Sequence, residues 1–396
     1  MRCASKMAGY LLGAATLATV SCMRTIAPVE PVVRDTTPST DTAIKSVLDT
    51  GWRQTGFRTP GSPTVAQLQV AGGVIATEDS ISRIWAFRPT TGWWQVPMPA
   101  GYYTRSYRSI QGLGDTFYIA GVARKGVSWN PNSGSMTTWQ IPGTPNDPDS
   151  SFIQAWGTYH GNLVASLSLI TRKYQVCEVW IRRAGQWSQL GKVPIPFIPF
   201  DVFYEATDGT LYAGGDEGLY YLGSDSVWTK VPPLPSCTGK YCDIGSIAGI
   251  TEYDGHGWVV TNGSTAGYFA FQFDFQNRQI LGGVNTYRVT DTLYSLYGFG
   301  PFHGLLHYKD YLFLFGIDDA PGAWVWNPKR QWFQHIPLLH RGVTYYTSNF
   351  ANTYGLAVLN DTLYASNSHG VVKYAISDIA ADLAHDTLPG IPPKLQ

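Results

Sequence analysis

Short stretches of apolar residues, separated by glycine- and proline-rich turns, make up most of the chain. The clearest example is residues 209–232, where three strands are predicted at 211–215, 219–222 and 228–232. Runs of this length between turn residues, rich in Leu, Tyr and Trp, are typical of β-strands. Three such strands cannot bury their own faces alone. The unit therefore requires neighbours of the same kind.

The turn and the strand that follows it recur seven times. The copies start at Gly73, Asp115, Gly161, Gly209, Gly257, Asp310 and Asp361, which are 42, 46, 48, 48, 53 and 51 residues apart. A closing strand with Trp follows most copies, a middle strand lies between, and a fourth strand precedes each turn. Four short strands at this period match one blade of a β-propeller. The sequence thus predicts an all-β, seven-bladed β-propeller over residues 51–376.

The two ends of this repeat array are incomplete in complementary ways. Residues 51–57 look like a closing strand with no blade before them, whereas the blade that starts near residue 350 has no closing strand. We expect the N-terminal strand to complete the last blade, because ring closure removes an exposed sheet edge. The Ala-rich run from Ile376 predicts a short helix in the C-terminal tail, 377–396. Residues 284–300 contain an extra Asp-Thr-Leu-Tyr and read as an insertion rather than a degenerate blade.

The blades resemble kelch repeats. Gly214-Gly215 match the kelch Gly-Gly doublet after the second strand, and Tyr221 and Trp228 match its aromatic and Trp positions, as do Trp180 and Trp187. The Asp-Gly-Thr-Leu-Tyr start also looks like the propeller repeats of two-component regulators. The resemblance implies a propeller, and a propeller fold by itself implies no particular function.

The N-terminus resembles a bacterial lipoprotein signal. Arg2 and Lys6 precede a short apolar run from Ala8 to Val20, and Ser21-Cys22 follows. The resemblance implies cleavage after residue 21 and lipidation of Cys22, although Thr19 stands where Leu is usual. An ordinary secreted or membrane-anchored form is the alternative. Residues 22–50 are rich in Thr and Pro and contain no aromatic residue, so they are expected to form a flexible tether.

Charge and composition narrow the possible partners. The chain has 28 basic and 28 acidic residues, and loss of residues 1–21 leaves 26 and 28, a net charge of −2. This balance gives no support to nucleic-acid binding. The sequence predicts an extracytoplasmic monomer, attached to a bacterial outer membrane or cell surface through its lipid.

Few residues carry recognisable chemistry. Cys237 and Cys242 share one loop and are expected to form a disulfide, with half of a metal site as the alternative. Cys177 is expected to be a buried free thiol. His303 and His307 share a strand face, but with no carboxylate in phase we predict packing or channel lining rather than metal binding. No metal and no cofactor is predicted. The recurring Trp residues, 52, 93, 139, 187, 228 and 332, are expected to pack one blade on the next.

The connections from each closing strand to the next inner strand are rich in Tyr and Arg, residues that are enriched at binding hot spots. These connections lie at one face of a propeller, so we predict a ligand or partner face there, with well-packed rim loops as the alternative. Its candidate residues are Tyr103, Arg105, Tyr107, Arg108, Phe200, Tyr287, Arg288, His340, Arg341, Tyr345 and Tyr346.

The sequence favours a non-catalytic binding or scaffold module for a protein or glycan. One alternative is a propeller enzyme, a glycoside hydrolase or lyase, that uses carboxylates at the channel mouth. Asp201, Glu205 and Asp243 would be its candidates. The other alternative is a structural component of the envelope. Two carboxylates at the channel mouth would favour the enzyme, whereas Arg and aromatic residues without such a pair would favour the binding module.

Overall fold

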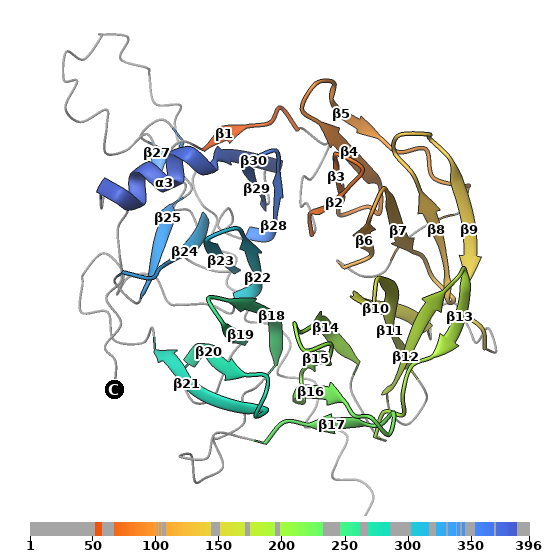
Figure 1. The fold of residues 1–396 in the computed structure, drawn as a ribbon. Helices are drawn as coiled ribbons and strands as arrows, with labels where there is room; N and C mark the ends of the chain where they lie inside the picture. Colours follow the sequence, from red (N-terminus) through yellow and green to blue (C-terminus); the bar gives the residue numbers. More distant parts are fainter. Residues whose placement is uncertain are drawn as a thin grey trace, which may run out of the picture. The chain divides into compact units, whose positions relative to one another are not determined.

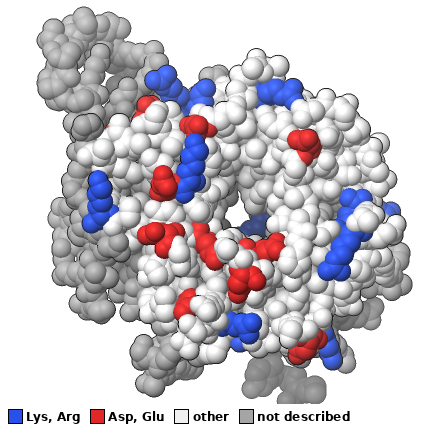
Figure 2. All heavy atoms as spheres, in the orientation of Figure 1, with Lys and Arg blue, Asp and Glu red and all other residues white. Residues whose placement is uncertain are grey.

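Seven four-stranded antiparallel sheets are arranged radially in the computed structural model (Figure 1), and a channel opens at their centre (Figure 2). The structure describes residues 52–57, 67–100, 102, 104, 108–143, 151–170, 175–194, 199–232, 246–261, 268–285, 302–316, 322–329, 332–337, 339–340, 343–344, 353–367 and 370–385. All of them belong to one compact unit, Ala43–Gln396. None of the helices among them is both long and apolar enough to cross a bilayer.

The sheets follow the predicted repeat, and we number them as blades 1 to 7. Blade 1 contains β2 (Gln69–Ala71), β3 (Val74–Glu78), β4 (Ile84–Arg88) and β5 (Gly92–Gln95). Blade 2 contains β6 (Ile110–Leu113), β7 (Thr116–Ala120), β8 (Lys125–Trp129) and β9 (Met136–Gln140). Blade 3 contains β10 (Ser151–Tyr159), β11 (Asn162–Ile170), β12 (Gln175–Arg183) and β13 (Gln186–Gln189). Blade 4 contains β14 (Phe200–Glu205), β15 (Leu211–Gly215), β16 (Gly218–Leu222) and β17 (Trp228–Lys230).

Blades 5 to 7 complete the ring. Blade 5 contains β18 (Ile247–Tyr253), β19 (His256–Thr261), β20 (Tyr268–Asp274) and β21 (Gln279–Asn285). Blade 6 contains β22 (Phe302–Tyr308), β23 (Tyr311–Gly316), β24 (Gly322–Asn327) and β25 (Trp332–Pro337). Blade 7 contains β28 (Thr353–Leu359), β29 (Thr362–Asn367), β30 (Gly370–Ala375) and β1 (Arg53–Gln54). The all-β, seven-bladed prediction is therefore confirmed.

The hydrophobic core is divided among the seven interfaces between neighbouring blades. Each interface has its own cluster of buried side chains, such as the cluster between blades 3 and 4 around Phe200, Leu211 and Trp228. Each sheet thus buries its two faces against its neighbours. This arrangement explains why the unit repeats along the sequence: a single blade would leave both faces in water.

The ring closes as predicted, because β1 pairs with β30 in the last blade. Arg53 is opposite Lys373 and Gln54 is opposite Val372 in an antiparallel ladder. Trp52 is only 4% exposed and lies beside Tyr374, with ring centroids 5.3 Å apart. Farther along the same segment, Phe57 packs on Trp93 of blade 1 at 4.3 Å. The N-terminal segment therefore completes blade 7 and seals it against blade 1.

Glycine allows the inner strands to approach each other near the centre. A Cβ atom on Gly249 of β18 would lie 2.7 Å from the backbone nitrogen of Leu305 in β22. A Cβ atom on Gly355 of β28 would lie 2.6 Å from the backbone nitrogen of Leu68, just before β2. These distances are shorter than side chains tolerate, so a larger residue would push neighbouring blades apart.

Several smaller expectations can also be compared with the structure. The Ala-rich run forms a helix, α3 (Ile376–His385), and Cys177 is a buried free thiol in β12. Trp139 and Trp228 are buried between blades, as expected. The connection after β25 contains a hairpin that the sequence did not predict, β26 (Leu339–His340) and β27 (Val343–Thr344). Cys22, Cys237, Cys242 and most of the 284–300 segment lie outside the described residues.

Candidate functional site: the connection end of the channel

The two ends of the channel are built from different segments. We call the turn end the one formed by the turns between the first and second strands, such as Ala206–Gly209 in blade 4. We call the connection end the opposite one. It contains the connections between blades, such as 96–109, and the turns between second and third strands, such as 79–83. The predicted partner face corresponds to the connection end.

One residue position recurs at the connection end of the inner strands. In five consecutive blades the pairing of the first strand skips one residue, which forms a β-bulge. The skipped residues are Gln154, Asp201, Ala248, His303 and Tyr354. Each stands four or five residues before its strand ends, and Arg108 stands five residues before the end of β6. Bulges re-aim a side chain and are frequent beside functional sites.

In blades 2 to 4 this position is occupied by interacting polar side chains. The Arg108 guanidinium Nη1 donates a hydrogen bond to the backbone carbonyl of Asp201, so Arg108 reaches from blade 2 to blade 4. The Gln154 amide Nε2 donates to Asp201 Oδ1 at 2.8 Å. We call Arg108, Gln154 and Asp201 the polar row. The corresponding residue in blade 5, Ala248, is apolar, so the polar row ends at blade 4 on that side.

Burial perturbs both charged members of the polar row. Burial lowers the pKa of Arg108, and the nearby Asp201 carboxylate opposes that shift. Burial raises the pKa of Asp201, while Arg108 and the hydrogen bond from Gln154 act in the opposite direction. Each charge therefore compensates for part of the desolvation of the other. The polar row is a preorganised charged group that depends on all three blades.

A second polar cluster adjoins the polar row at the start of β6. The Ser109 hydroxyl donates a hydrogen bond to Glu78 Oε2, at the end of β3. The Ser109 carbonyl accepts from the Ala120 amide at 2.7 Å and from the Trp156 indole at 3.0 Å. Ser109 thus joins blades 1, 2 and 3 at one point. Arg108, next to it in sequence, has its backbone fixed by these contacts.

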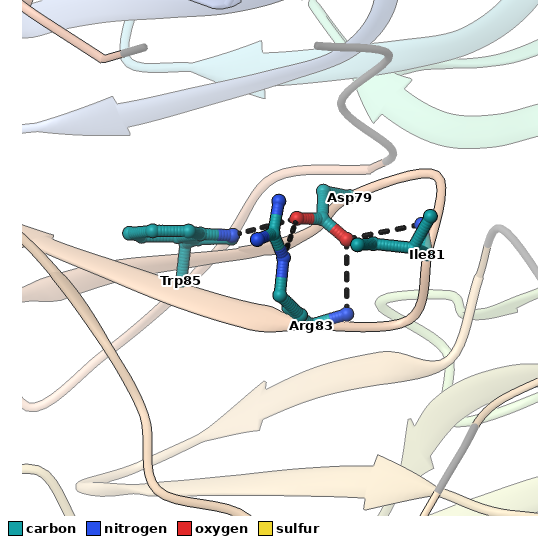
Figure 3. Close-up of polar contacts among 4 residues, drawn as sticks. All are labelled: Asp79, Ile81, Arg83 and Trp85. Carbon is teal, nitrogen blue, oxygen red and sulfur yellow. Dashed lines mark hydrogen bonds and ion pairs between the residues drawn. The ribbon is translucent and has the colours of Figure 1, made fainter. Parts of the chain in front are cut away.

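The turn after Glu78 is held rigid by a single carboxylate. Asp79 Oδ1 accepts from the amides of Ile81 at 3.1 Å and Arg83 at 3.0 Å (Figure 3). Asp79 Oδ2 accepts from Arg83 Nε at 2.6 Å and from the Trp85 indole at 2.9 Å (Figure 3). Ile81 at the tip of this turn is 65% exposed, an unusual exposure for a large aliphatic side chain.

The rigid turn is attached to the neighbouring connection. The Ser82 hydroxyl donates to the Thr104 carbonyl at 3.3 Å, and the Thr104 hydroxyl donates to Ser82 Oγ at 3.2 Å. Tyr102, in the same connection, donates its hydroxyl proton to the Ile119 carbonyl at 2.7 Å. The connection between blades 1 and 2 is therefore fixed by side-chain hydrogen bonds at Tyr102 and Thr104, one to blade 2 and one to blade 1.

The turn end has a different kind of contact. The Glu205 carboxylate accepts from the His160 amide at 2.8 Å and lies 2.8 Å from His160 Nδ1, which ties β14 to the turn of blade 3. Glu252 accepts from the Thr207 amide at 3.0 Å and ties β18 to the turn of blade 4. The Tyr308 hydroxyl donates to Asp361 Oδ1 at 2.6 Å in the same way for blades 6 and 7.

Acidic side chains gather beside the channel opening, over β14 and β18, and a basic side chain is visible deep inside it (Figure 2). The turn-end carboxylates of these strands, Glu205 and Glu252, are engaged in the contacts between blades described above. No group of three or more His, Cys, Asp or Glu residues suited to a metal ion occurs within the described ranges. His307 Nε2 lies 2.7 Å from the Lys309 carbonyl, in its own turn.

The structure places the predicted site residues in four groups. Arg108 lies at the connection end, as expected. Phe200, also predicted to face a partner, is completely buried and packs on Trp228 at 4.9 Å, so it belongs to the core. His340 lies in β26, where only its backbone is described. The others lie outside the described residues: Tyr103, Arg105, Tyr107, Tyr287, Arg288, Arg341, Tyr345 and Tyr346.

The carboxylates considered for an enzyme do not form a pair. Asp201 and Glu205 lie at opposite ends of β14, four residues apart, a separation of about 13 Å at the usual rise of a strand. Paired glycosidase carboxylates are about 5 to 10 Å apart. Asp243 lies outside the described residues. Glu78 and Gln154, which sequence reasoning missed, complete the site instead.

Comparisons with known proteins define the fold and nothing finer. The sequence matches no protein-family model and no curated protein. The structure is similar to the WD40 β-propeller domain of Doa1, with a TM-score of 0.54 and 8% identity over 82% of this chain and 96% of that domain. It is also similar to a chain of the mitotic checkpoint complex, with a TM-score of 0.55 and 9% identity over 88% and 97% of the two chains. The chain is thus a seven-bladed β-propeller similar in fold to a WD40 domain.

Proposed function

We propose that this protein is a non-catalytic binding module whose partner docks on the connection end of the channel. The observation that carries this proposal is the polar row, in which one residue from each of three adjacent blades joins a single hydrogen-bonded group. Such a group is preorganised by the whole ring, so a partner that contacts it loses little entropy in ordering the site. The separation of Asp201 from Glu205 supports binding rather than glycoside chemistry.

The partner we propose is a protein. Ile81 presents an exposed aliphatic side chain at the connection end, on a turn that Asp79 holds rigid. Apolar anchors on rigid elements, surrounded by polar groups, are typical of the centres of protein interfaces. Glycans are bound mainly through hydrogen-bonding groups and flat aromatic rings, and an aliphatic tip offers neither.

A capture experiment with matched surface variants tests this proposal. Full-length protein, Ile81→Glu and Leu281→Glu are used to capture partners from envelope extracts of the source cells. Leu281 is the control because it is 52% exposed but lies on the outer strand β21. We expect a protein that wild type and Leu281→Glu retain and that Ile81→Glu loses. Equal loss in both variants, or no partner in any sample, would contradict the proposal and favour a purely structural role.

We also propose that the protein is an extracytoplasmic lipoprotein anchored through Cys22. The charged start, the short apolar run and the Ser21-Cys22 junction support this localisation. The test is Cys22→Ala with membrane fractionation. Release into the soluble fraction, or accumulation of unprocessed protein, is expected. Processed Cys22→Ala protein that remains in the membrane fraction would contradict lipid anchoring.

The kelch type of repeat remains a proposal that the glycine doublet supports. Gly214 and Gly215 end β15, and added Cβ atoms would lie 2.4 Å from Ile247 and 2.8 Å from the Pro199 carbonyl. Trp228 begins the fourth strand and donates its indole proton to the Leu190 carbonyl of blade 3 at 3.1 Å. Both features perform in blade 4 the packing roles that the kelch pattern implies.

A further inference from the structure

Two adjacent carboxyl groups at the connection end are both buried but have very different surroundings. Asp79 is 4% exposed and receives four hydrogen bonds, one of them from the Arg83 guanidinium. Glu78 is 5% exposed, and the groups that act on it are the hydroxyls of Ser109 and Ser82 and the negative charge of Asp79. None of these is a cation. Asp79 therefore has a cation and four donors that offset its burial, whereas no cation offsets the burial of a charge on Glu78.

The titratable and charged groups around Glu78 reinforce this difference. Asp79 repels a second negative charge, and its own charge is balanced by Arg83. Tyr102, from the neighbouring connection, stays neutral because burial and the charge of Glu78 both raise its pKa. Burial, the largest effect, raises the pKa of Glu78 to about 7, although the hydrogen bonds from Ser109 and Ser82 lower it. Arg108 immediately precedes Ser109 in the sequence and donates to the Asp201 carbonyl.

The place of Glu78 in the fold gives its ionisation a structural consequence. A buried carboxylate without a cation must gain water when it ionises. The group that shields Glu78 is Ser109, which also holds the Trp156 indole and the Ala120 amide. Hydration of Glu78 therefore acts at the start of β6, beside Arg108.

Resting on the binding function proposed above, we propose that Glu78 is a proton-operated latch for the partner-binding end of the channel. While its carboxyl group is protonated, Glu78 stays buried against Ser109 and holds the start of β6, and with it the polar row, in the binding geometry. When the proton leaves, the carboxylate draws in water beside Ser109, the start of β6 shifts, and Arg108 loses its fixed position. Partner binding is consequently stronger at mildly acidic than at mildly alkaline pH.

The latch can be tested without the partner, so its failure is distinguishable from failure of the proposed function. The full-length protein is labelled with 15N in the Trp indoles, and Trp→Phe variants assign the resonances of Trp156 and Trp228. Trp156 reports on Ser109, and Trp228, bonded to Leu190 in another interface, is the internal reference. We expect the Trp156 resonance to titrate with a midpoint near pH 7, while the Trp228 resonance does not move.

Two variants test whether the titration belongs to Glu78. Glu78→Gln should abolish the titration of Trp156. Ser109→Ala should raise its midpoint, because the hydroxyl bond favours the ionised form. A Trp156 resonance that does not move between pH 5 and 9 in the wild type, or titrates unchanged in Glu78→Gln, would overturn the latch. If Glu78→Gln does not fold, an unchanged midpoint in Ser109→Ala would overturn it equally.

Discussion

The two ends of the channel differ in how far their carboxylates are buried. At the turn end, carboxylates such as Glu205 and Asp361 lie in partial or full contact with water and link one blade to the next. At the connection end, Glu78 and Asp79 are buried and Asp201 is partly buried, and burial raises the pKa values of Glu78 and Asp201. Buried charge costs stability and is retained where it has a use. The comparison supports the proposal that the turn end links the blades and the connection end binds the partner.

The largest expected effect is on ring closure, on which both ends of the channel depend. Trp52→Ala should lower the free energy of unfolding by about 3 to 5 kcal/mol, because it removes a buried indole from the strand that closes the ring. Urea unfolding is the measurement, with Trp228→Ala as the matched control in a blade closed by its own strand. A loss much smaller than that of Trp228→Ala would show that ring closure contributes little to either end.

The next prediction concerns the pH dependence of stability, to which the two ends of the channel should contribute differently. Because the pKa of Glu78 is about 7 in the folded protein and 4.5 ordinarily, the folded state binds the proton more tightly. The resulting stability is fully present below pH 4.5, declines as pH rises, and is lost above pH 7. Glu78→Gln should remove this decline and raise stability at pH 8 by up to roughly 3 kcal/mol.

Urea unfolding at several pH values measures this effect. Glu205→Gln, at the turn end, is the control, and we expect it to leave the decline between pH 4.5 and 7 unchanged. A wild-type protein whose stability does not fall over this interval, or a Glu78→Gln variant with the same decline, would contradict the contrast between the ends.

Much of this architecture was predictable from sequence, and the reason is local. The sequence patterns that predicted the blades are short-range: the seven turns, the Trp positions and the unpaired strand at 51–57. The strands that they predicted are present in the structure. The polar row is different, because Arg108 and Asp201 are 93 residues apart and meet only through ring geometry and a bulge. Glu78 was not identified from the sequence, because it ends a strand whose other residues are mostly apolar. Two adjacent acidic residues between two buried strands, Glu78 and Asp79, could have served as a signal.

A smaller effect concerns the polar row itself. Arg108→Ala should lower the free energy of unfolding by about 2 kcal/mol, because it removes a charged hydrogen bond and leaves the Asp201 carboxylate without its compensating cation. Thermal unfolding is the measurement. Arg278→Ala is the control, since this exposed arginine lies over the Tyr221 ring at 4.2 Å and interacts with the Tyr212 hydroxyl. If the two variants behaved alike, the polar row would contribute no more than a surface contact.

The smallest effect is expected at the turn end. Lys309→Met removes the ion pair between Lys309 Nζ and Asp361 Oδ1, which are 2.5 Å apart. The two side chains are 58% and 61% exposed. Exposed pairs contribute little because water screens them. Thermal unfolding should show no measurable change, and partner capture should be unaffected. A clear loss of either would show that the turn end does more than link blades.

Site-specific photo-crosslinking at the two ends tests most directly where the partner binds. A photoreactive amino acid is placed at Ile81, on the connection end, or at Asp208, in the exposed β14–β15 turn of the turn end. Both proteins are irradiated in cells of the source organism, and the adducts are identified by mass spectrometry. A discrete protein adduct from position 81, with none from position 208, is the predicted result. An adduct from position 208 with none from position 81 would contradict it.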